Sequence, residues 1–455
     1  MEAGTYVVVD LGKTVAKVSL WSKAGRCLQK VTRTNETPVA APYRPLDMAA
    51  TADWLVQVLA QFSAHPVEAI IPVAHGAAVA GIRQGALAFA SPDYEWDMPA
   101  ADLAAYRAQR DPFALTGSPA LPAGLNFGAQ LHMLEALGSF EGVTLLPYAQ
   151  YWAWLLSGTA VSEVTSLGCH SDLWCPAAAD FSPMARARGW ASRFAPMARA
   201  GDVVGRLRPE LAARTGLSPQ VRIHAGLHDS NAALLAVRGF AEIAGQEATV
   251  LSTGTWFIAM RSPAGPADLA ALPEDRDCLV NVDAFGQPVP SARLMGGREV
   301  ELLGERIDRA GTNGLADVLL AGGMALPSQV PGCGPFPTCT ARWVDRPGDA
   351  AERGAAVALY AALMTDAALD LIGSSERLVI EGRFAASELF TRALASLRPG
   401  TQVWTASGEA DVSFGALRLI DPALVPVEAL SPVAPLDRSL DPYRDHWYDA
   451  LEAFA

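Results

Sequence analysis

Positive charge is scarce in this sequence. Of its 455 residues, 18% are charged, and 35 lysines and arginines against 48 aspartates and glutamates leave a formal charge of −13 and a pI near 5.0. Nucleic acids and anionic membrane surfaces are bound by dense basic faces. We therefore expect neither as a partner, whereas a phosphate ligand, which needs only a few donors at one place, stays open.

Cysteine is also rare, with six residues scattered along the chain. This is too few for a disulfide scaffold at this length. The five-residue gaps within the pairs Cys169/Cys175 and Cys333/Cys339 fit no common zinc spacing. We expect buried free thiols instead.

Signals for secretion and membrane insertion are missing as well. The chain leads directly into a strand-like run at 6–9 with no basic region or cleavage site, so we expect no signal peptide. The most apolar later stretch, 355–372, carries Asp366 and Asp370 and is interpreted as a buried amphipathic helix rather than a span. These features predict a soluble cytoplasmic protein.

Apolar residues make up 51% of the chain, which is enough for a large core, and the length predicts two or three domains. One strand–turn–strand unit lies in each half, with turns at Gly12-Lys13-Thr14 and at 252–255, and this repetition predicts a duplicated architecture. Strand-like and helical segments alternate elsewhere, which predicts α/β layers. We place the boundary at 238–246 and interpret the Pro- and Asp-rich tail from Asp421 as an extended arm.

The first turn combines glycine, hydroxyl and positive charge. The only lysines of the chain are Lys13, Lys17, Lys23 and Lys30. Gly12-Lys13-Thr14 is not a P-loop, because Val7 stands where that motif needs glycine and 15–21 reads as a strand rather than a helix. The turn can still bind phosphate through Gly12, the Thr14 hydroxyl and both nearby lysines. A solvated hairpin turn is the alternative interpretation.

The second turn, Ser252-Thr253-Gly254-Thr255, offers three hydroxyls and a glycine without charge. Such a turn suits a polyphosphate whose charge is neutralised by a metal ion, although alone it is an ordinary turn composition. Together the two turns suggest hairpins facing one nucleotide across a cleft. A third glycine, Gly382, lies between a strand at 378–380 and a helix at 387–397, a position typical of nucleotide contacts and of tight turns alike.

Asp229 lies in Gly226-Leu227-His228-Asp229-Ser230, directly before an Ala-rich helix. An aspartate at this position is commonly a helix N-cap. The functional interpretation is a general base that takes a proton from an attacking hydroxyl. A serine-hydrolase interpretation fails, because adjacent residues do not generally form a triad and the chain has no Gly-x-Ser-x-Gly elbow.

In this order and spacing, Asp10-x-Gly12-x-Thr14, His228-Asp229, Ser252-x-Gly254-Thr255 and Glu381-Gly382 resemble the FGGY family of carbohydrate kinases. The similarity covers nearly the whole chain and looks closest to the rhamnulokinase and fuculokinase branch. It implies an α/β fold of two RNase H-like domains of the actin-like ATPase superfamily with an interdomain cleft. The implied domains are an N-terminal sugar-binding and phosphate-loop domain, 1–240, and a C-terminal nucleotide-binding domain, 241–455.

The resemblance implies transfer of the ATP γ-phosphoryl group to a hydroxyl of a ketose, with L-fuculose and L-rhamnulose as first substrates and Mg²⁺ as cofactor. Asp229 matches the catalytic base, and Asp10 matches a metal-site carboxylate that acts, with Asp229, through water. Residues matching sugar contacts are His75, Gly76, His228, Ser230 and Arg293. Residues matching ATP contacts are Lys13, Thr14, Lys17, Gly254, Thr255, Glu301 and Gly382.

The sequence departs from the family pattern at several positions. Gln130 and Met133 stand where many members have a lysine and a tryptophan, and the adenosine-loop glycine run is reduced to Gly382-Arg383-Phe384. We therefore keep two alternatives. One is a kinase of a ketopentose, xylulose or ribulose, and the other is a catalytically degenerate switch that binds ATP and sugar. Homodimers are common among similar kinases, but nothing in this sequence demonstrates one.

Overall fold

The computed structural model describes residues 4–454 except Thr37, Val39, Ser139, 263–267, 308–311 and 407–410. Contacts between residues divide the chain into two compact units that are interleaved in sequence. The first unit contains Met1–Gly239, Val280–Pro288 and Ala410–Pro426, and the second contains Phe240–Leu279, Val289–Glu409 and Val427–Ala455. Two segments from the second half of the chain thus belong to the first unit.

The first unit is built on a mixed sheet in the order β10-β11-β4-β1-β2-β3, with β12 also paired to β4. β1, β2 and β3 pair antiparallel to one another, whereas β4 is parallel to β1 and to β11. Every residue of β1 is buried, as expected for a central strand. The strands are β1 (Thr5–Leu11), β2 (Val15–Ser22), β3 (Cys27–Thr34), β4 (Val67–Ala74), β10 (Val203–Arg206), β11 (Arg222–His224) and β12 (Leu227–His228).

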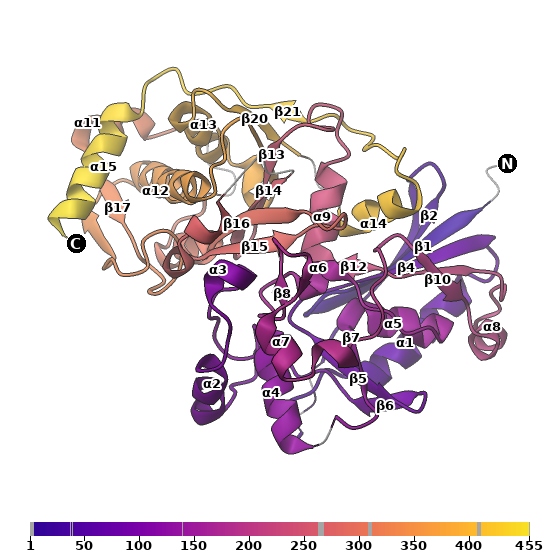
Figure 1. Ribbon diagram of the computed structural model, residues 1–455. Helices are drawn as coiled ribbons and strands as arrows, with labels where there is room; N and C mark the ends of the chain where they lie inside the picture. The colour runs from indigo at the N-terminus through magenta and orange to yellow at the C-terminus, as the bar shows by residue number, and fades with distance from the viewer. Residues whose placement is uncertain are drawn as a thin grey trace. The chain divides into compact units, whose positions relative to one another are not determined.

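Helices and small strands complete the first unit, and α1 and α5 share one apolar core with the sheet (Figure 1). α14 packs closely on α9, since a Cβ added at Gly415 would lie 1.7 Å from the Ala232 carbonyl oxygen. The elements are α1 (Met48–Gln61), β5 (Val79–Arg83), β6 (Ala86–Phe89), α2 (Ala100–Arg107), α3 (Phe113–Thr116), α4 (Phe127–Leu137), β7 (Thr144–Pro147), α5 (Tyr148–Ser157), α6 (Val164–Leu167), β8 (Trp174–Cys175), β9 (Asp180–Phe181), α7 (Pro183–Ala187), η1 (Ala191–Arg193), α8 (Pro209–Thr215), α9 (Asp229–Val237) and α14 (Val412–Ile420).

The second sheet has the order β15-β16-β14-β13-β19-β20-β21. β13 and β14 form an antiparallel hairpin extended by β16, whereas β19 is parallel to β13 and to β20. The strands are β13 (Ala248–Thr253), β14 (Phe257–Ser262), β15 (Cys278–Val282), β16 (Pro288–Leu294), β19 (Arg377–Gly382), β20 (Gln402–Thr405) and β21 (Ser431–Pro432).

The two sheets share one connectivity. In each, a hairpin is extended by a third antiparallel strand on one side and by two parallel strands on the other: β3-β2-β1-β4-β11 and β16-β14-β13-β19-β20. The turns at Gly12 and Gly254 occupy the same place in this scheme, because each joins the first two strands of its sheet. The prediction of a duplicated α/β architecture is therefore confirmed.

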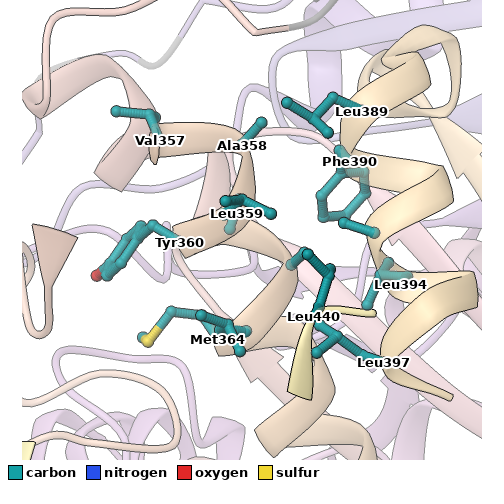
Figure 2. Packing of buried hydrophobic residues seen from close by; sticks show 14 of the residues in the cluster. Val357, Ala358, Leu359, Tyr360, Met364, Leu389, Phe390, Leu394, Leu397 and Leu440 are labelled. Carbon is teal, nitrogen blue, oxygen red and sulfur yellow. The ribbon is translucent and has the colours of Figure 1, made fainter. Parts of the chain in front are cut away.

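The second unit has its core around α12, whose residues from Ala355 to Leu369 are all buried. In Figure 2, Leu359 of α12 lies toward Phe390 and Leu394 of α13, whereas Val357 and Tyr360 lie on the other side of α12. The other elements are η2 (Leu269–Ala271), η3 (Glu274–Arg276), α10 (Gly296–Leu302), α11 (Leu315–Ala321), β17 (Met324–Leu326), β18 (Arg342–Val344), α12 (Ala350–Leu371), η4 (Arg383–Ala386), α13 (Glu388–Leu397) and α15 (Asp441–Ala453).

Two sequence predictions need correction in this unit. The prediction that 355–372 is a buried helix rather than a span is confirmed, since 83% of the most apolar window of α12 is buried, as in a core helix. The helix is not amphipathic there, because Ala355 to Leu369 are buried on all sides. The tail is not simply an extended arm, since α15 forms there and buries Tyr443, Trp447 and Leu451. Proline and aspartate at the start of α15 fit the first turn of a helix, which the composition-based interpretation overlooked.

Candidate functional site

The turn between β1 and β2 is held in shape by a side chain from the end of β3. The Asn35 side-chain amide donates to the Gly12 carbonyl oxygen at 2.8 Å, and the Asn35 backbone N–H donates to the Thr14 carbonyl oxygen at 2.8 Å. The Thr14 side chain stays exposed. β2 begins directly after Thr14, so the exclusion of a P-loop is confirmed and the turn presents a hydroxyl on a fixed backbone.

Both lysines near this turn are engaged by carboxylates. Lys17 Nζ lies 3.0 Å from Asp10 Oδ2 and 3.1 Å from Asp411 Oδ2. Burial raises the pKa of Asp10 to about 6 against the opposing effect of Lys17, and the charges of Asp229 and Asp411 raise it further. Asp411 also caps α14 by accepting from two of its backbone N–H groups, so Lys17 is oriented by a group that is itself fixed.

Lys13 lies against the segment that follows β6. Its Nζ is 2.6 Å from Asp93 Oδ1 and 3.2 Å from Glu95 Oε2, and it stands 5.3 Å from the centre of the Tyr94 ring. Asp93 is itself buried and accepts a second ion pair from Arg44 at 2.8 Å. These carboxylates compensate the positive charge of Lys13 and orient its side chain beside the first turn.

At the end of β4, His75 and Gly76 lie close to the residues that follow β12. The His75 ring is buried against Tyr94 and Tyr148, with ring centres 5.5 and 5.0 Å away. A Cβ added at Gly76 would lie 2.6 Å from His228 Nε2, so only glycine leaves room for that ring. The structure therefore brings together His75, Gly76 and His228, three of the residues that the resemblance assigns to the sugar.

Asp229 is the first residue of α9, and His228 holds the N-cap position. The simple N-cap interpretation of Asp229 is therefore wrong. One carboxylate oxygen, Oδ1, accepts from the Ser230 backbone N–H at 2.6 Å and lies 3.2 Å from His228 Nε2. The Asp229 side chain keeps 28% of its surface exposed, in contrast to the buried His228. It is a carboxylate that is fixed on one side and accessible on the other.

Burial sets the protonation of these groups. It lowers the pKa of His228 to about 4 and also lowers the pKa of His75, so both imidazoles are neutral at pH 7. It raises the pKa of Asp229, while the hydrogen bonds from Ser230 oppose that shift. A carboxylate with a raised pKa binds a proton more readily, which is the property that a general base needs.

Gln130, one of the departures from the family pattern, is buried behind this cluster. Its Nε2 donates to the Ala77 carbonyl oxygen at 2.6 Å and to the Gly124 carbonyl oxygen at 2.7 Å. It therefore connects the segment after Gly76 to the loop before α4. The neighbouring departure, Met133, is a buried residue of the apolar core.

In the second unit, the turn at Gly254 is supported by the start of α10. The Gly254 N–H donates to the Trp256 carbonyl oxygen at 2.9 Å, and the Arg298 N–H donates to the Thr255 carbonyl oxygen at 3.3 Å. A Cβ added at Gly297 would lie 2.0 Å from the Gly254 carbonyl oxygen. The Thr255 side chain is exposed on this rigid turn, as Thr14 is on the first turn.

Gly382 ends β19 beside the same turn, paired with Thr253 of β13. Its φ of +83° and the 2.3 Å distance from an added Cβ to the Thr253 carbonyl oxygen both require glycine. The preceding Glu381 is half-buried; loss of solvent around its carboxyl group raises its pKa, and the carboxylate accepts from the Ser252 hydroxyl at 2.5 Å. The structure therefore brings Gly382 together with Gly254 and Thr255, as predicted.

Arg293 and Glu301 belong to the second unit and are engaged by protein groups. Arg293 donates to Asp277 Oδ1 through Nε and Nη2 at 3.0 and 2.8 Å, and it stacks on Trp256 next to the Gly254 turn. Glu301, on α10, pairs with Arg298 at 3.2 Å and Arg383 at 3.4 Å. Arg293 is thus placed in a different unit from the other predicted sugar contacts.

The residues of the first unit fit a divalent metal that arrives with a nucleotide. Mg²⁺ is commonly held by one or two carboxylates together with substrate phosphates. Asp10 and Asp229 are two such carboxylates, close enough that the charge of Asp229 raises the pKa of Asp10. The described residues contain no cluster of three or more histidine, cysteine, aspartate or glutamate residues that would hold a metal ion alone.

Several residues that contact the predicted site residues were not found from the sequence: Asn35, Asp93, Asp411, and Tyr94 as a partner of Lys13. Each acts across a long stretch of chain; Asp411 reaches Lys17 over 394 positions. A buried aspartate or threonine has no distinctive local pattern, so only the strand order shows these contacts.

The two α/β units share one connectivity, and each presents a glycine–hydroxyl turn. This is the architecture of a phosphotransferase with two actin-like ATPase domains. The model for the C-terminal domain of FGGY carbohydrate kinases matches residues 245–427. The crystal structure of a carbohydrate kinase from Novosphingobium aromaticivorans is 56% identical, with 100% of this chain and 99% of that chain covered and a TM-score of 0.96. The chain belongs to the FGGY family of carbohydrate kinases.

More distant structures share the fold alone. A xylulose kinase from Rhodospirillum rubrum is 18% identical, with 99% and 98% of the two chains covered and a TM-score of 0.79. Plasmodium falciparum glycerol kinase with ADP is 12% identical, with 99% of each chain covered and the same TM-score. A search of curated protein sequences gives no match. The predicted fold class is confirmed, and the protein is an ATP-using sugar phosphotransferase whose sugar these relatives do not specify.

Proposed function

We propose that this kinase transfers the γ-phosphoryl group of ATP to a hydroxyl of a ketose, with Asp229 as general base. L-Fuculose and L-rhamnulose are the first substrates, on the resemblance of the segments around His228-Asp229 and Ser252–Trp256 to that branch of the family. Xylulose and ribulose are the next. Sugar binding and the first phosphate loop fall to residues 1–240, and nucleotide binding falls to 241–455.

The state of Asp229 is the observation that carries this proposal. Its carboxylate is fixed by the Ser230 N–H, partly exposed, and raised in pKa by burial. Neutral His228 and His75 lie beside it without competing for a proton at pH 7. A base positioned in this way can accept the proton of a sugar hydroxyl as the hydroxyl attacks phosphorus, which is typically worth about 10²–10⁴-fold in rate.

The surroundings of Asp229 suit a polar ring with apolar faces. Tyr94 and His75 offer aromatic surface, whereas Ser230 and His228 offer hydrogen-bonding groups. Sugar sites combine these two properties, because the faces of the sugar ring are apolar and its edges carry hydroxyls. We assign His75, Gly76, His228, Ser230 and, from the second unit, Arg293 to sugar recognition.

Phosphoryl transfer depends mainly on positioning and charge neutralisation. We assign ATP binding to Lys13, Thr14 and Lys17 of the first turn and to Gly254, Thr255, Glu301 and Gly382 of the second unit. Asp10 and, through water, Asp229 would hold Mg²⁺, which when bound neutralises phosphate charge. Because Lys13 and Lys17 already contact carboxylates, ATP has to compete with Asp93 and Asp411 for them.

The test is a coupled ADP-release assay with Mg-ATP against deoxy-ketohexoses, ketohexoses, ketopentoses and polyols. We expect one sugar class to give a strong signal, and Asp229→Ala to lower kcat by about 10²–10⁴-fold while ATP binding survives. Asp53→Ala, a change at an exposed aspartate on α1, is the matched control and should keep full activity.

Near-wild-type turnover by Asp229→Ala would remove Asp229 from its role as base. Silence of the wild type across the whole panel, with ATP still bound in calorimetry, would favour the degenerate switch. A signal confined to xylulose or ribulose would replace the deoxy-ketohexose assignment while leaving the chemistry unchanged.

A further inference from the structure

Two buried residues at the start of α6, its N-cap Glu163 and Thr165, form a hydrogen-bonded chain to the backbone that leads into Asp229. The His228 N–H donates to the Thr165 hydroxyl oxygen at 2.9 Å, and that hydroxyl donates to Glu163 Oε2 at 2.5 Å. The Thr165 backbone N–H donates to the same oxygen at 2.9 Å. Glu163 and Thr165 are both fully buried.

The direction of these bonds is fixed by chemistry. The His228 N–H can only donate, so the Thr165 oxygen accepts there and its single hydrogen is left for Glu163. Glu163 Oε2 therefore accepts two hydrogen bonds, whereas Oε1 has no hydrogen-bond partner among the described residues. Each group in this chain depends on the next one for its orientation.

The contact point is one residue before Asp229. β12 contains only Leu227 and His228 and is held on one side by β4, with His228 paired to Ala74. Thr165 supplies the contact to the His228 N–H, after which α9 begins at Asp229. The backbone that carries Asp229 is therefore fixed by the sheet and by α6 together.

We propose that Glu163 and Thr165 are positioning residues for the kinase reaction, which hold the His228 backbone and through it aim the Asp229 carboxylate. This rests on the proposed role of Asp229 as base. Neither residue touches substrate; they act by keeping the base at its working distance, since a misplacement of about 1 Å can cost roughly 10²-fold in rate.

The protonation of Glu163 supports this role. Burial raises the pKa of Glu163 to about 8, and the charge of Asp283, from the segment Val280–Pro288, raises it further; Asp283 itself interacts with Arg238. Below that pH the side chain is neutral, with Oε2 accepting and a proton on Oε1. Glutamine reproduces this state, because its amide oxygen accepts in the same way and it carries no charge.

The experiment compares Thr165→Val with Thr165→Ser. Valine keeps the shape but removes the hydroxyl, so we expect kcat to fall by roughly 10²-fold with the KM for ATP unchanged, whereas serine should stay within about threefold of the wild type. Thr215→Val is the matched control, since Thr215 is also buried in the first unit with two hydrogen bonds, to the Leu211 oxygen and from the Leu217 N–H. Rates are compared per folded molecule, measured by thermal unfolding.

A second pair, Glu163→Gln and Glu163→Leu, tests the carboxyl group. We expect Glu163→Gln to keep kcat and Glu163→Leu to lower it. Because Glu163 ionises near pH 8, we also expect wild-type kcat to decline above about pH 8 and kcat of Glu163→Gln not to decline there. Equal kcat in Thr165→Val and wild type, or an equal loss in Thr165→Val and Thr215→Val, would overturn the proposal. If Asp229→Ala remains active, the assignment of Asp229 as the base fails. If Asp229→Ala is inactive while Thr165→Val and Glu163→Leu keep wild-type kcat, only the positioning role fails.

Discussion

Gly76 shows how a residue without a side chain shapes the site. Its backbone φ is ordinary, so its need for glycine comes only from the His228 ring, 2.6 Å from where a Cβ would stand. The sequence placed Gly76 at the sugar only through the family resemblance. The physical reason for glycine became visible when β4 and β12 were seen to pair.

Gly76→Ala is therefore expected to displace the His228 ring and to destabilise the protein by about 1–3 kcal/mol, with a raised KM for the sugar. Gly354→Ala is the control: an added Cβ in α12 meets nothing within 4 Å and should be neutral or stabilise by up to about 1 kcal/mol. Thermal unfolding and sugar kinetics measure both effects. Equal stability of the two variants would contradict the steric explanation.

Asp10 predicts how activity depends on pH. Burial raises its pKa to about 6, and both Asp10 and Asp229 have to be ionised for their proposed roles, so kcat/KM should fall as the pH drops through about 6. Lys17 lowers the pKa of Asp10, hence Lys17→Met should move this decline to higher pH. Lys23→Met, which removes an exposed ion pair with Glu68, should leave it in place. A decline that moves to lower pH in Lys17→Met would refute this explanation.

Among individual residues, the sequence found those that stand inside glycine–hydroxyl turns or directly before a helix. It missed Asp93, Asp411 and Thr165, because each acquires its role from a partner far along the chain, and it missed Glu163, whose role depends on Thr165. The assigned roles of the predicted site residues stay predictions until the variants are measured.

At the scale of elements, α12 shows why charged residues in a helical sequence do not by themselves identify a solvent-exposed face. Its charged residue Asp366 was read as evidence for a polar face, yet it is buried and paired with Arg398 Nη1 at 2.6 Å. Arg398 follows α13 and also contacts Asp370 at 2.9 Å. The ion pair thus ties the end of α13 to α12.

Removing the Asp366 carboxylate leaves the buried Arg398 with the solvent-exposed Asp370 as its remaining carboxylate partner and with the Ser374 carbonyl oxygen. Asp366→Ala should lower the free energy of unfolding by about 3 kcal/mol, whereas Asp370→Ala, whose side chain is 67% exposed, should cost less than about 1 kcal/mol. Urea denaturation of both variants checks the difference. Similar losses would mean that the burial of Asp366 does not decide its contribution.

For the whole molecule, the main feature is that each unit has its own apolar core. One core is formed by β1, β4, α1 and α5 of the first unit, and the other by α12 and α13 with the second sheet. Multidomain chains with separate cores commonly do not unfold in a single step. The return of Val280–Pro288 and Ala410–Pro426 to the first unit makes the division discontinuous in sequence.

We expect calorimetric unfolding to show more than one transition, and Asp366→Ala to lower only one of them, because its ion pair lies wholly within the second unit. Thr215→Val, in the first unit, should lower the other. If either variant shifts both transitions equally, the two cores unfold as one cooperative unit.

The sequence by itself determined the α/β class, the duplicated hairpins and the turns at Gly12 and Gly254, because these depend on strand periodicity and on glycine and hydroxyl residues within a few positions. It also determined, through resemblance, the kinase family. Only the tertiary structure decided which groups surround Asp229 and which partners fix the lysines. Those contacts arise from strand order and long-range packing, which place residues dozens to hundreds of positions apart within hydrogen-bonding distance.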